Sequence, residues 1–317
     1  MEGARADVRR RRGEGSGAVL DAGVPAIMSP YGHLARLSMV WEATARKIGN
    51  VHPGARFVDI EYMDFLRSAM SVSWDVRSLS YRMLLGGLIY ESVQSTRCSV
   101  TSNTNLGMIL LLAPLVLTAE SDNYHAALVE LLASTDVRDT QLLYKAIRIA
   151  SPGGLGDAPE QDIRNEPTVT LLEAMRLAAD RDMIARQYAN GFADVFDFGV
   201  PAFTDAFARF GCVEAAVVDS QLRWLAAYPD SLIARKNGSA IAEDVQKRAA
   251  EVLRLGGIAT PEGRAAGVAL DKHLRSDGNK LNPGTTADLI TACLFVALRE
   301  NKVFPSAPFR WDVPDWL

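Results

Sequence analysis

Residues 282–288, Asn282-Pro283-Gly284-Thr285-Thr286-Ala287-Asp288, precede an apolar segment from Leu289 to Leu298. Asparagine is a common N-cap and proline is favoured at the first helical position, so we predict a helix that begins near Pro283. The backbone amides that follow would lack helical acceptors and, with the helix dipole, would favour an anion such as phosphate. Asp288 would face the same site and hold a cation or take a proton. An ordinary capped helix is the alternative interpretation.

Three other polar loops have a similar character. Residues 103–107 lead into the apolar run 108–116, residues 151–157 form a glycine-rich loop, and residues 47–54 form a turn after a helix. Asn, Gly and Pro mark turns in most proteins, so each loop alone is weak support. Together they predict one composite cavity. The candidate phosphate or nucleotide ligands are Lys47, Asn50, His52, Asn103, Thr104, Asn105, Gly153, Gly154, Arg235, Lys280, Asn282, Gly284, Thr285 and Thr286.

The composition favours one large globular domain. The chain has 317 residues, 48% of them hydrophobic, and no linker rich in Ser and Pro interrupts it. Residues 1–28 are basic near their start and rich in glycine, so we expect a flexible extension, with residues 29–317 as a single catalytic domain. The segment lacks the apolar stretch of a secretory signal. A nucleic-acid arm or a targeting segment is the alternative for it.

Charge and cysteine content limit the partners. The formal net charge is −4, and it is more negative without the basic segment, so a broad nucleic-acid surface is not expected. The apolar runs are shorter than the roughly 20 residues of a membrane span. Cys98, Cys212 and Cys293 are odd in number and widely spaced, which argues against a disulfide framework and a structural zinc site. We therefore expect a cytoplasmic protein.

Apolar residues recur at spacings of three and four along most of the chain, which predicts an all-α fold: a single multi-helical domain with a central polar cleft lined by helix N-termini and loops rich in Gly and Asn. The Gly86-Gly87 pair within one helix predicts a close helix crossing. The predicted helices cover residues 31–48, 60–72, 74–95, 103–118, 122–133, 137–149, 168–195, 201–227, 239–255, 261–275 and 284–299.

Acidic residues near the polar loops are candidates for catalysis and metal binding. Asp59 and Asp64 follow the 47–54 loop, and Glu173 and Asp180 share one predicted helical face. Carboxylates beside phosphates suit Mg²⁺, which prefers oxygen ligands. We therefore predict Mg²⁺ as the cofactor, with Asp59, Asp64 and Asp180 as ligands and Asp64, Glu173 and Asp288 as catalytic groups. Solvated acids and helix-surface ion pairs are the alternative. His52 could contact phosphate or shuttle a proton.

In this order, the segments resemble the triphosphoribosyl-dephospho-CoA synthase family over about residues 33–298. The resemblance rests on ordered blocks at residues 47–51, 62–69, 103–107, 153–158, 230–235 and 282–289. It implies an all-helical transferase that takes ATP and 3′-dephospho-CoA, releases adenine, and joins the triphosphoribosyl group to a ribose hydroxyl with inversion. Separate groups for deprotonating the acceptor and protonating the leaving base would suit such a displacement.

The chain departs from that family at two positions. Residues 103–107 read Asn-Thr-Asn-Leu-Gly where the family has Asn-Thr-His-Lys-Gly, and residues 155–157 read Leu-Gly-Asp where it typically has Arg-Gly-Glu. Each lost cation removes a charge-assisted contact worth about 1.5–3 kcal/mol. The chain is similar to a divergent branch associated with tetrahydromethanopterin. The donor could then be another phosphorylated ribosyl compound, and the acceptor a pterin precursor.

Three hypotheses therefore stand: transfer from ATP to dephospho-CoA, a related ribosyl transfer in tetrahydromethanopterin biosynthesis, and a non-catalytic nucleotide-binding protein. The sequence leaves the oligomeric state open, with a homodimer as one option.

Overall fold

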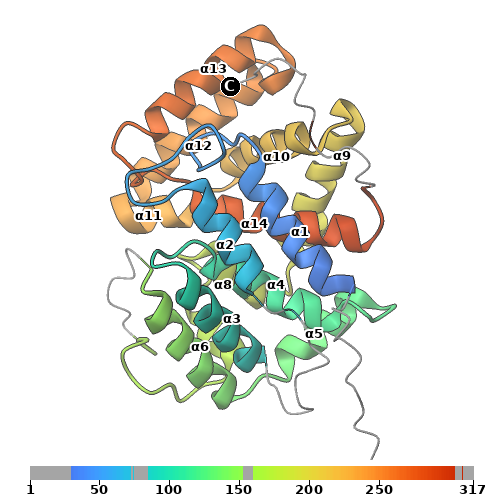
Figure 1. Cartoon of the computed structure of the whole chain (residues 1–317), viewed down its shortest axis with the longest axis vertical. Coiled ribbons are helices and arrows are strands. Elements are labelled where there is room, and N and C mark those ends of the chain that lie inside the picture. Colours follow the sequence, from blue (N-terminus) through green and yellow to red (C-terminus); the bar gives the residue numbers. More distant parts are fainter. Residues whose placement is uncertain (1–29, 73, 75–84, 153–159, 304–308, 310–317) are drawn as a thin grey trace, which may run out of the picture.

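The protein is helical throughout the part of the chain that the computed structural model describes, which comprises residues 30–72, 74, 85–152, 160–303 and 309. In the described residues, the β-structure consists of one isolated bridge between His52 and Ala55. The all-α prediction is confirmed (Figure 1). The elements are α1 (Pro30–Thr44), α2 (Tyr62–Ser71), α3 (Leu85–Ser99), α4 (Leu106–Thr118), α5 (Tyr124–Ala133), α6 (Val137–Ala150), α7 (Leu171–Ala178), α8 (Met183–Ala189), the π-helix η1 (Asp194–Gly199), α9 (Val200–Phe210), α10 (Val213–Ala227), α11 (Ser231–Asn237), α12 (Ser239–Arg254), the 3₁₀-helix η2 (Gly257–Ala259), α13 (Pro261–Leu274) and α14 (Gly284–Arg299).

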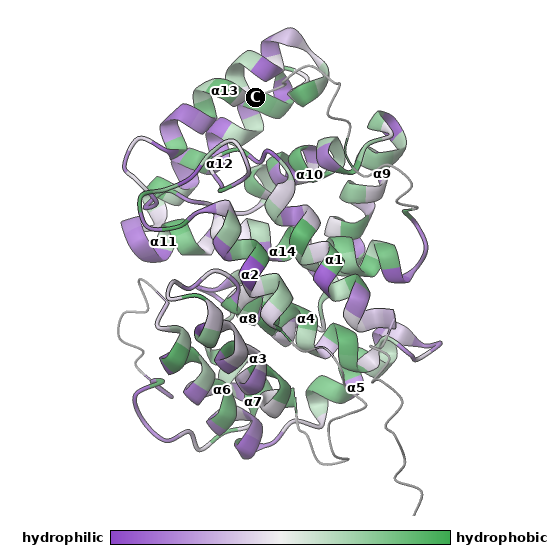
Figure 2. Cartoon of the chain, viewed as in Figure 1, coloured by the Kyte–Doolittle hydropathy of each residue, from purple (hydrophilic) through white to green (hydrophobic). Residues whose placement is uncertain are grey.

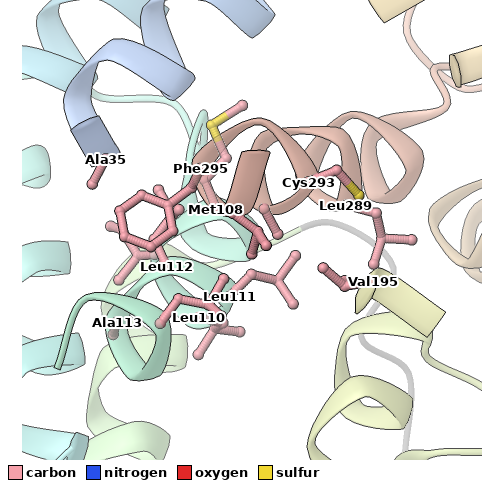
Figure 3. Close-up of a cluster of buried hydrophobic side chains, with 14 of the residues drawn as sticks. Ala35, Met108, Leu110, Leu111, Leu112, Ala113, Val195, Leu289, Cys293 and Phe295 are labelled. Atoms are coloured by element: carbon pink, nitrogen blue, oxygen red, sulfur yellow. The ribbon is translucent and has the colours of Figure 1, made fainter. Parts of the chain in front are cut away.

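Helices α4 and α14 form the centre of the core. Both are apolar around most of their circumference, and a helix of that kind is stable only when other elements cover it. Figure 3 shows Met108, Leu111 and neighbouring side chains of α4 packed against Leu289 and Phe295 of α14. The first turns of these two central helices lie at the site described below.

Helices α3 and α6 pack closely, as the glycine pair in α3 predicts. A Cβ atom on Gly86 would lie 2.4 Å from the backbone oxygen of Asp139 on α6, so no larger residue fits. The Gly86 amide also donates to Asp139 Oδ1 over 2.7 Å. The backbone contact and the hydrogen bond explain why α3 carries a residue that weakens an isolated helix.

A second apolar cluster joins α10, α12 and α13. Val218 and Leu222 of α10, Val245 and Val252 of α12, and Leu270 of α13 belong to it. Figure 2 shows hydrophilic residues along the outer sides of α12 and α13, opposite these contacts. Within the described ranges, no helix combines the length and the apolar character that a bilayer crossing requires.

Two predicted long helices are each divided, and the first division places Asp182 at the site. The 168–195 segment breaks between α7 and α8, where Asp182 Oδ1 accepts hydrogen bonds from the amides of Ile184 and Ala185. The 201–227 segment breaks at Gly211, whose positive φ of 62° ends α9. The short helix α11 was not predicted. It begins after a second capping carboxylate, Asp230.

Candidate functional site

A cavity of about 670 Å³ lies where the four predicted loops meet the first turns of α4 and α14, and the fourth loop contributes Ser151 and Pro152. Its wall includes the end of α1, the end of α3, the start of α8, and α11. Eleven of the predicted site residues line it: Lys47, Asn50, Asp59, Asn103, Thr104, Asn105, Arg235, Asn282, Gly284, Thr285 and Asp288. Gly153 and Gly154, from the fourth loop, lie outside the described residues.

The predicted cap of α14 is one residue off. Pro283, rather than Asn282, takes the N-cap position, and the helix begins at Gly284. The Asn282 side chain instead accepts a hydrogen bond from Asn50 Nδ2 over 2.6 Å. Asn50 Oδ1 in turn accepts one from Gln221 Nε2 over 2.6 Å. These amides hold the 47–51 loop against the start of α14.

The first turn of α14 already binds a carboxylate of the protein itself. Asp230 Oδ2 accepts from both the amide and the hydroxyl of Thr286, each over 2.8 Å. Its other oxygen caps α11 by accepting from the amides of Leu232 and Ile233 over 2.9 and 3.0 Å. Asp230 is therefore a buried anion with four donors that ties two helix starts together. The Thr286 amide, predicted to be free for phosphate, is not.

Asp288 lies against the start of α4, the second predicted anion site. A Cβ atom on Gly107 would come within 1.9 Å of Asp288 Oδ2, so the glycine is what allows the carboxylate this close. Burial is the main cause that raises the pKa of the Asp288 carboxyl well above its usual range. Three carboxylates add to that effect, and Arg235 opposes it; the three are Glu42, Asp230 and Asp182. A protonated Asp288 is thus favoured.

A buried ion pair forms the wall beside the end of α1. Glu42 and Lys47 are each 1% exposed, and Lys47 Nζ lies 3.0 Å from Glu42 Oε1. The ammonium also donates to the backbone oxygens of Glu42 and Ala45. With three protons and three acceptors, Lys47 has no donor left for a phosphate. On the cavity wall, Lys47 therefore pairs with Glu42. Glu42 was not predicted as a site residue.

Four cations line the cavity, and they differ in what they already bind. Lys47 is satisfied by Glu42, and Arg235 donates from Nη1 to Asp182 while its Nε has no hydrogen-bond partner in the described part. Lys236 donates to the backbone oxygen of Asn279 over 3.2 Å, and Arg97 donates to that of Thr101. Neither Lys236 nor Arg97 is held by a carboxylate within 4 Å among the described residues. These two are the cations best able to turn to an anion.

Several side chains of the polar loop before α4 already form hydrogen bonds within the protein. Asn105 donates to Thr96 Oγ1 over 3.1 Å, and the Thr104 hydroxyl bonds to that of Ser68. Asn103 lines the cavity and its Oδ1 accepts from the Leu106 amide over 3.3 Å, while its amide nitrogen has no hydrogen-bond partner among the described residues. Of the three predicted ligands in this loop, Asn103 is the least committed.

Several predicted site residues do not line the cavity. Asp64 belongs to the capping box of α2 and pairs with Arg67 at 3.6 Å. Glu173 belongs to the capping box of α7, where it accepts from Thr170. Asp180 is exposed in the turn after α7, and Lys280 pairs with Asp277 at 2.9 Å. These four side chains have local structural partners or surface positions.

His52 also lies off the cavity wall. Its Nδ1 accepts from the Gly54 amide over 3.1 Å, within its own turn. Burial, with smaller contributions from Lys47 and Arg275, lowers the pKa of His52 to about 4. The imidazole is therefore neutral near pH 7, and proton exchange there, as considered from the sequence, does not fit its surroundings.

The predicted metal ligands are dispersed. Asp59 is at the cavity wall, where it accepts from Asn279 Nδ2 over 2.6 Å, but Asp64 and Asp180 are not on that wall. Among the residues that the structure describes, no three His, Cys, Asp or Glu side chains stand together as metal ligands. The magnesium ion remains a prediction.

The cavity contains residues that sequence reasoning missed: Glu42, Arg97, Asp182, Lys236 and Asn279. Lys236 is adjacent to the predicted Arg235, and Asp182 precedes a short helix, so both carried a weak local signal. Glu42 carried none, because one acid within an apolar helix is usually a surface residue.

Comparisons with known proteins agree with this arrangement. The family described as ATP:dephospho-CoA triphosphoribosyl transferase matches residues 28–304. A protein from Pseudomonas putida named "Probable 2-(5''-triphosphoribosyl)-3'-dephosphocoenzyme-A synthase" is 34% identical over 113 residues, which are 35% of this chain and 40% of that protein. The "2-(5''-triphosphoribosyl)-3'-dephosphocoenzyme-A synthase" of Klebsiella pneumoniae is 31% identical over 113 residues, again 35% and 40%. The chain thus matches about two fifths of the length of these curated relatives.

A solved structure shares the fold. The crystal structure of a "putative triphosphoribosyl-dephospho-coA synthase" from Archaeoglobus fulgidus superposes with a TM-score of 0.58 and 27% identity, over 74% of this chain and 98% of that one. The family match covers most of the chain, including every described residue of the cavity wall. The chain therefore belongs to the ATP:dephospho-CoA triphosphoribosyl transferase family of enzymes.

Proposed function

We propose that this protein transfers a triphosphoribosyl group from ATP to a hydroxyl of 3′-dephospho-CoA and releases adenine. The family match over residues 28–304 carries the proposal. The cavity supports it, because carboxylates suited to proton transfer and cationic side chains suited to phosphates line the same wall. The names of the relatives point to the same reaction, although the alignments cover only part of those proteins.

Asp288 is suited to protonate the leaving base. Adenine is a poor leaving group as an anion, so breaking its bond to ribose requires a proton on a ring nitrogen. Burial and the neighbouring carboxylates raise the pKa of Asp288, so it keeps its proton to higher pH than an ordinary carboxyl, and it lies against Gly107 at the cavity wall. A carboxyl kept neutral by its surroundings is a common general acid.

The donor phosphates would contact the two least committed cations. Arg97 comes from the last turns of α3 and Lys236 from α11, and both line the cavity. Figure 1 shows α3 and α11 in the lower and upper halves of the molecule. A phosphate chain between them would fix the ribose near Asp288. Positioning of this kind supplies much of the rate in group transfer.

Magnesium fits this site as an ion that arrives with the phosphates. Mg²⁺ is commonly held by one or two carboxylates, several waters and phosphate oxygens, so dispersed acidic residues are compatible with it. Asp59 is the carboxylate on the cavity wall best placed for it, since it is close to Lys236 and has one oxygen not engaged by Asn279. The ion would neutralise phosphate charge there.

The first test is adenine release. The purified chain is incubated with ATP, 3′-dephospho-CoA and Mg²⁺, and adenine is measured by chromatography with the product checked by mass. We expect adenine and product in equal amounts, and a loss of at least about 100-fold in Asp288→Asn because the general acid is gone. Retained nucleotide binding in the variant would separate catalysis from binding. No adenine from the wild type over a range of pH and metal concentrations would reject this substrate pair.

A related ribosyl transfer to a pterin precursor is the second candidate. The observation behind it is that Leu106 lines the cavity at the position where the family has a lysine, and that Asn105 beside it bonds to Thr96. Fewer cations favour a donor with fewer phosphates. Native mass spectrometry after incubation with ATP and with phosphoribosyl compounds discriminates between the two, since the true donor should be retained at the lower concentration. If ATP and the phosphoribosyl compounds are retained equally weakly, the result favours neither candidate donor.

The non-catalytic hypothesis makes a different prediction for Asp288. A pure nucleotide-binding protein should keep its cellular role in Asp288→Asn as long as folding and affinity survive. Loss of that role with binding intact would contradict it.

A further inference from the structure

Glu42 combines deep burial with an uncommitted carboxylate oxygen. The residue is in the last turn of α1 and lines the cavity, yet it is only 1% exposed. Lys47 Nζ lies 3.0 Å from Oε1 in an ion pair, but neither carboxylate oxygen has a hydrogen-bond partner in the described part of the chain, and Oε2 lacks the ion-pair contact as well. Buried carboxylates nearly always collect donors, so a free oxygen at a cavity wall requires a reason.

The pairing with Lys47 favours a charged Glu42 in this position. Lys47 directs two of its protons to backbone oxygens and one toward Glu42, which fixes both side chains without using Oε2. An uncompensated buried charge would cost several kcal/mol, and the ion pair reduces that cost. Lys47 thus positions Glu42, and Glu42 presents an acceptor to whatever enters the cavity.

Glu42 and Asp288 differ in the charges beside them, so one is better suited to accept a proton and the other to donate one. Glu42 has a cation beside it and Asp288 has carboxylates around it, and the charge of Glu42 is the largest single charge effect on Asp288. Burial raises the pKa of both carboxyls, but Lys47 opposes the rise at Glu42 whereas the neighbouring carboxylates add to it at Asp288. A pair in which one carboxyl gives up its proton more readily than the other suits a general base and a general acid.

We propose that Glu42 is the general base that accepts the proton of the attacking acceptor hydroxyl. This inference rests on the proposed ribosyl transfer. In the step, the hydroxyl oxygen forms a bond to the anomeric carbon of the donor ribose and its proton passes to Glu42 Oε2. The bond from that carbon to the base nitrogen breaks, the electron pair stays on the nitrogen, and Asp288 supplies the proton. Water then returns both carboxyl groups to their initial states.

The charged groups that face Glu42 are few. Lys47 follows on the same chain segment, and Asp288 comes from α14, which packs against α1. Helix α4 contributes no charged residue, and α10 contributes Glu214, whose carboxylate is bound by Arg46 at 2.8 Å. On α2, Asp64 and Arg67 pair with each other. The proton affinity of Glu42 is therefore set mainly by burial and by Lys47.

The test compares Glu42→Gln with a double variant. The single change keeps the shape but leaves Lys47 buried without its partner, which can prevent folding. The double change Glu42→Gln with Lys47→Met removes both charges, and replacing a whole buried pair is often tolerated. Glu251→Gln is the matched control, because Glu251 is an exposed partner of Arg254 away from the cavity. Circular dichroism and thermal melting verify folding.

We expect the folded Glu42 variants to lose adenine release at least about 100-fold while they bind ATP within about threefold of wild type. Glu251→Gln should match wild type in both. Adenine release within fivefold of wild type in a folded Glu42 variant would overturn the assignment of Glu42 while leaving the proposed reaction intact. If the wild-type protein releases no adenine, the proposed reaction itself is rejected, whatever the variants show.

A second measurement uses Lys47→Met alone. Lys47 lowers the pKa of Glu42, so its removal raises that pKa and the base becomes active only at higher pH. The acidic limb of kcat against pH should shift upward by at least about one pH unit, with KM for ATP within threefold. A purely structural role for the pair predicts lower activity with an unmoved limb, and that result would overturn the assignment.

Discussion

Two carboxylates beside the same cavity, the buried Asp230 and the half-buried Asp288, have different surroundings. Asp230, at the start of α11, accepts four hydrogen bonds and joins two helix ends. Asp288, one turn into α14, has no hydrogen bond among the described residues and lies against Gly107. Burial raises the pKa of both, but only at Asp230 do several donors oppose that shift. The difference separates a residue that stabilises the fold from one that costs stability.

The comparison explains why the predicted phosphate sites look as they do. Helix starts attract anions, and the chain fills the starts of α14 and α4 with its own carboxylates. Asp230 accepts hydrogen bonds from the amide and hydroxyl of Thr286. Asp288 has no such donors, and its surroundings raise its pKa. A free anion therefore has to be recognised mainly by side chains such as Lys236.

The largest effect on stability should come from Asp230→Ala. The change removes two helix caps and leaves the Thr286 amide buried without an acceptor, which together should lower the free energy of unfolding by about 4 kcal/mol. Asp136→Ala is the control, since Asp136 caps α6 alone and its loss should cost about 1 kcal/mol. Urea denaturation measures both. Equal losses in the two variants would mean that Asp230 does not join the helices.

A smaller effect is expected at the contact between Gly107 and Asp288. A methyl group on Gly107 would displace the carboxylate, so Gly107→Ala should lower the free energy of unfolding by about 1–2 kcal/mol, net of the better helix propensity of alanine. In an Asp288→Ala background, the same change should cost less than half as much, because the remaining close contact is with the end of the flexible Ile184 side chain, at 2.7 Å. Urea denaturation of the four proteins in this cycle measures the coupling. Additive effects would show that the contact carries no energy.

The fold was largely predictable, because it depends on local periodicity. Apolar spacing located α4, α5, α6 and α14 to within a few residues. The errors occurred where a capping side chain divides a long apolar pattern, at Asp182, or where a positive φ ends a helix, at Gly211. At both positions the helix could continue or end, and tertiary contacts decide which occurs.

The site was only partly predictable, for a different reason. Loops rich in Asn, Gly and Thr were brought together as expected, yet the acids near them in sequence, Asp64 and Glu173, became helix caps. One acid on the cavity wall that was not predicted, Glu42, lies within an apolar helix, 246 residues before Asp288. Sequence separation carries no signal for such a pair, because only the packing of α1 against α14 brings them together.

The smallest effect tests the cost of Asp288 directly. A carboxyl with a raised pKa in the folded state binds a proton that the unfolded chain has released, so its contribution to stability is complete below about pH 4 and declines as pH rises toward the folded value. Asp288→Asn has no such decline. Its stability relative to wild type should therefore increase between pH 5 and pH 8 by at least about 1 kcal/mol, because each pH unit over which the folded carboxyl keeps its proton contributes 1.36 kcal/mol.

Urea denaturation at the two pH values provides this measurement. Asp244→Asn is the control, because Arg248 lowers the pKa of Asp244 and the group is ionised in both states over this range. The control should give the same difference from wild type at pH 5 and pH 8. If Asp288→Asn behaves in the same way as the control, Asp288 is ionised in the folded protein, and it cannot serve as the acid that protonates adenine. A gain at pH 8 together with lost adenine release would show that Asp288 trades stability for activity.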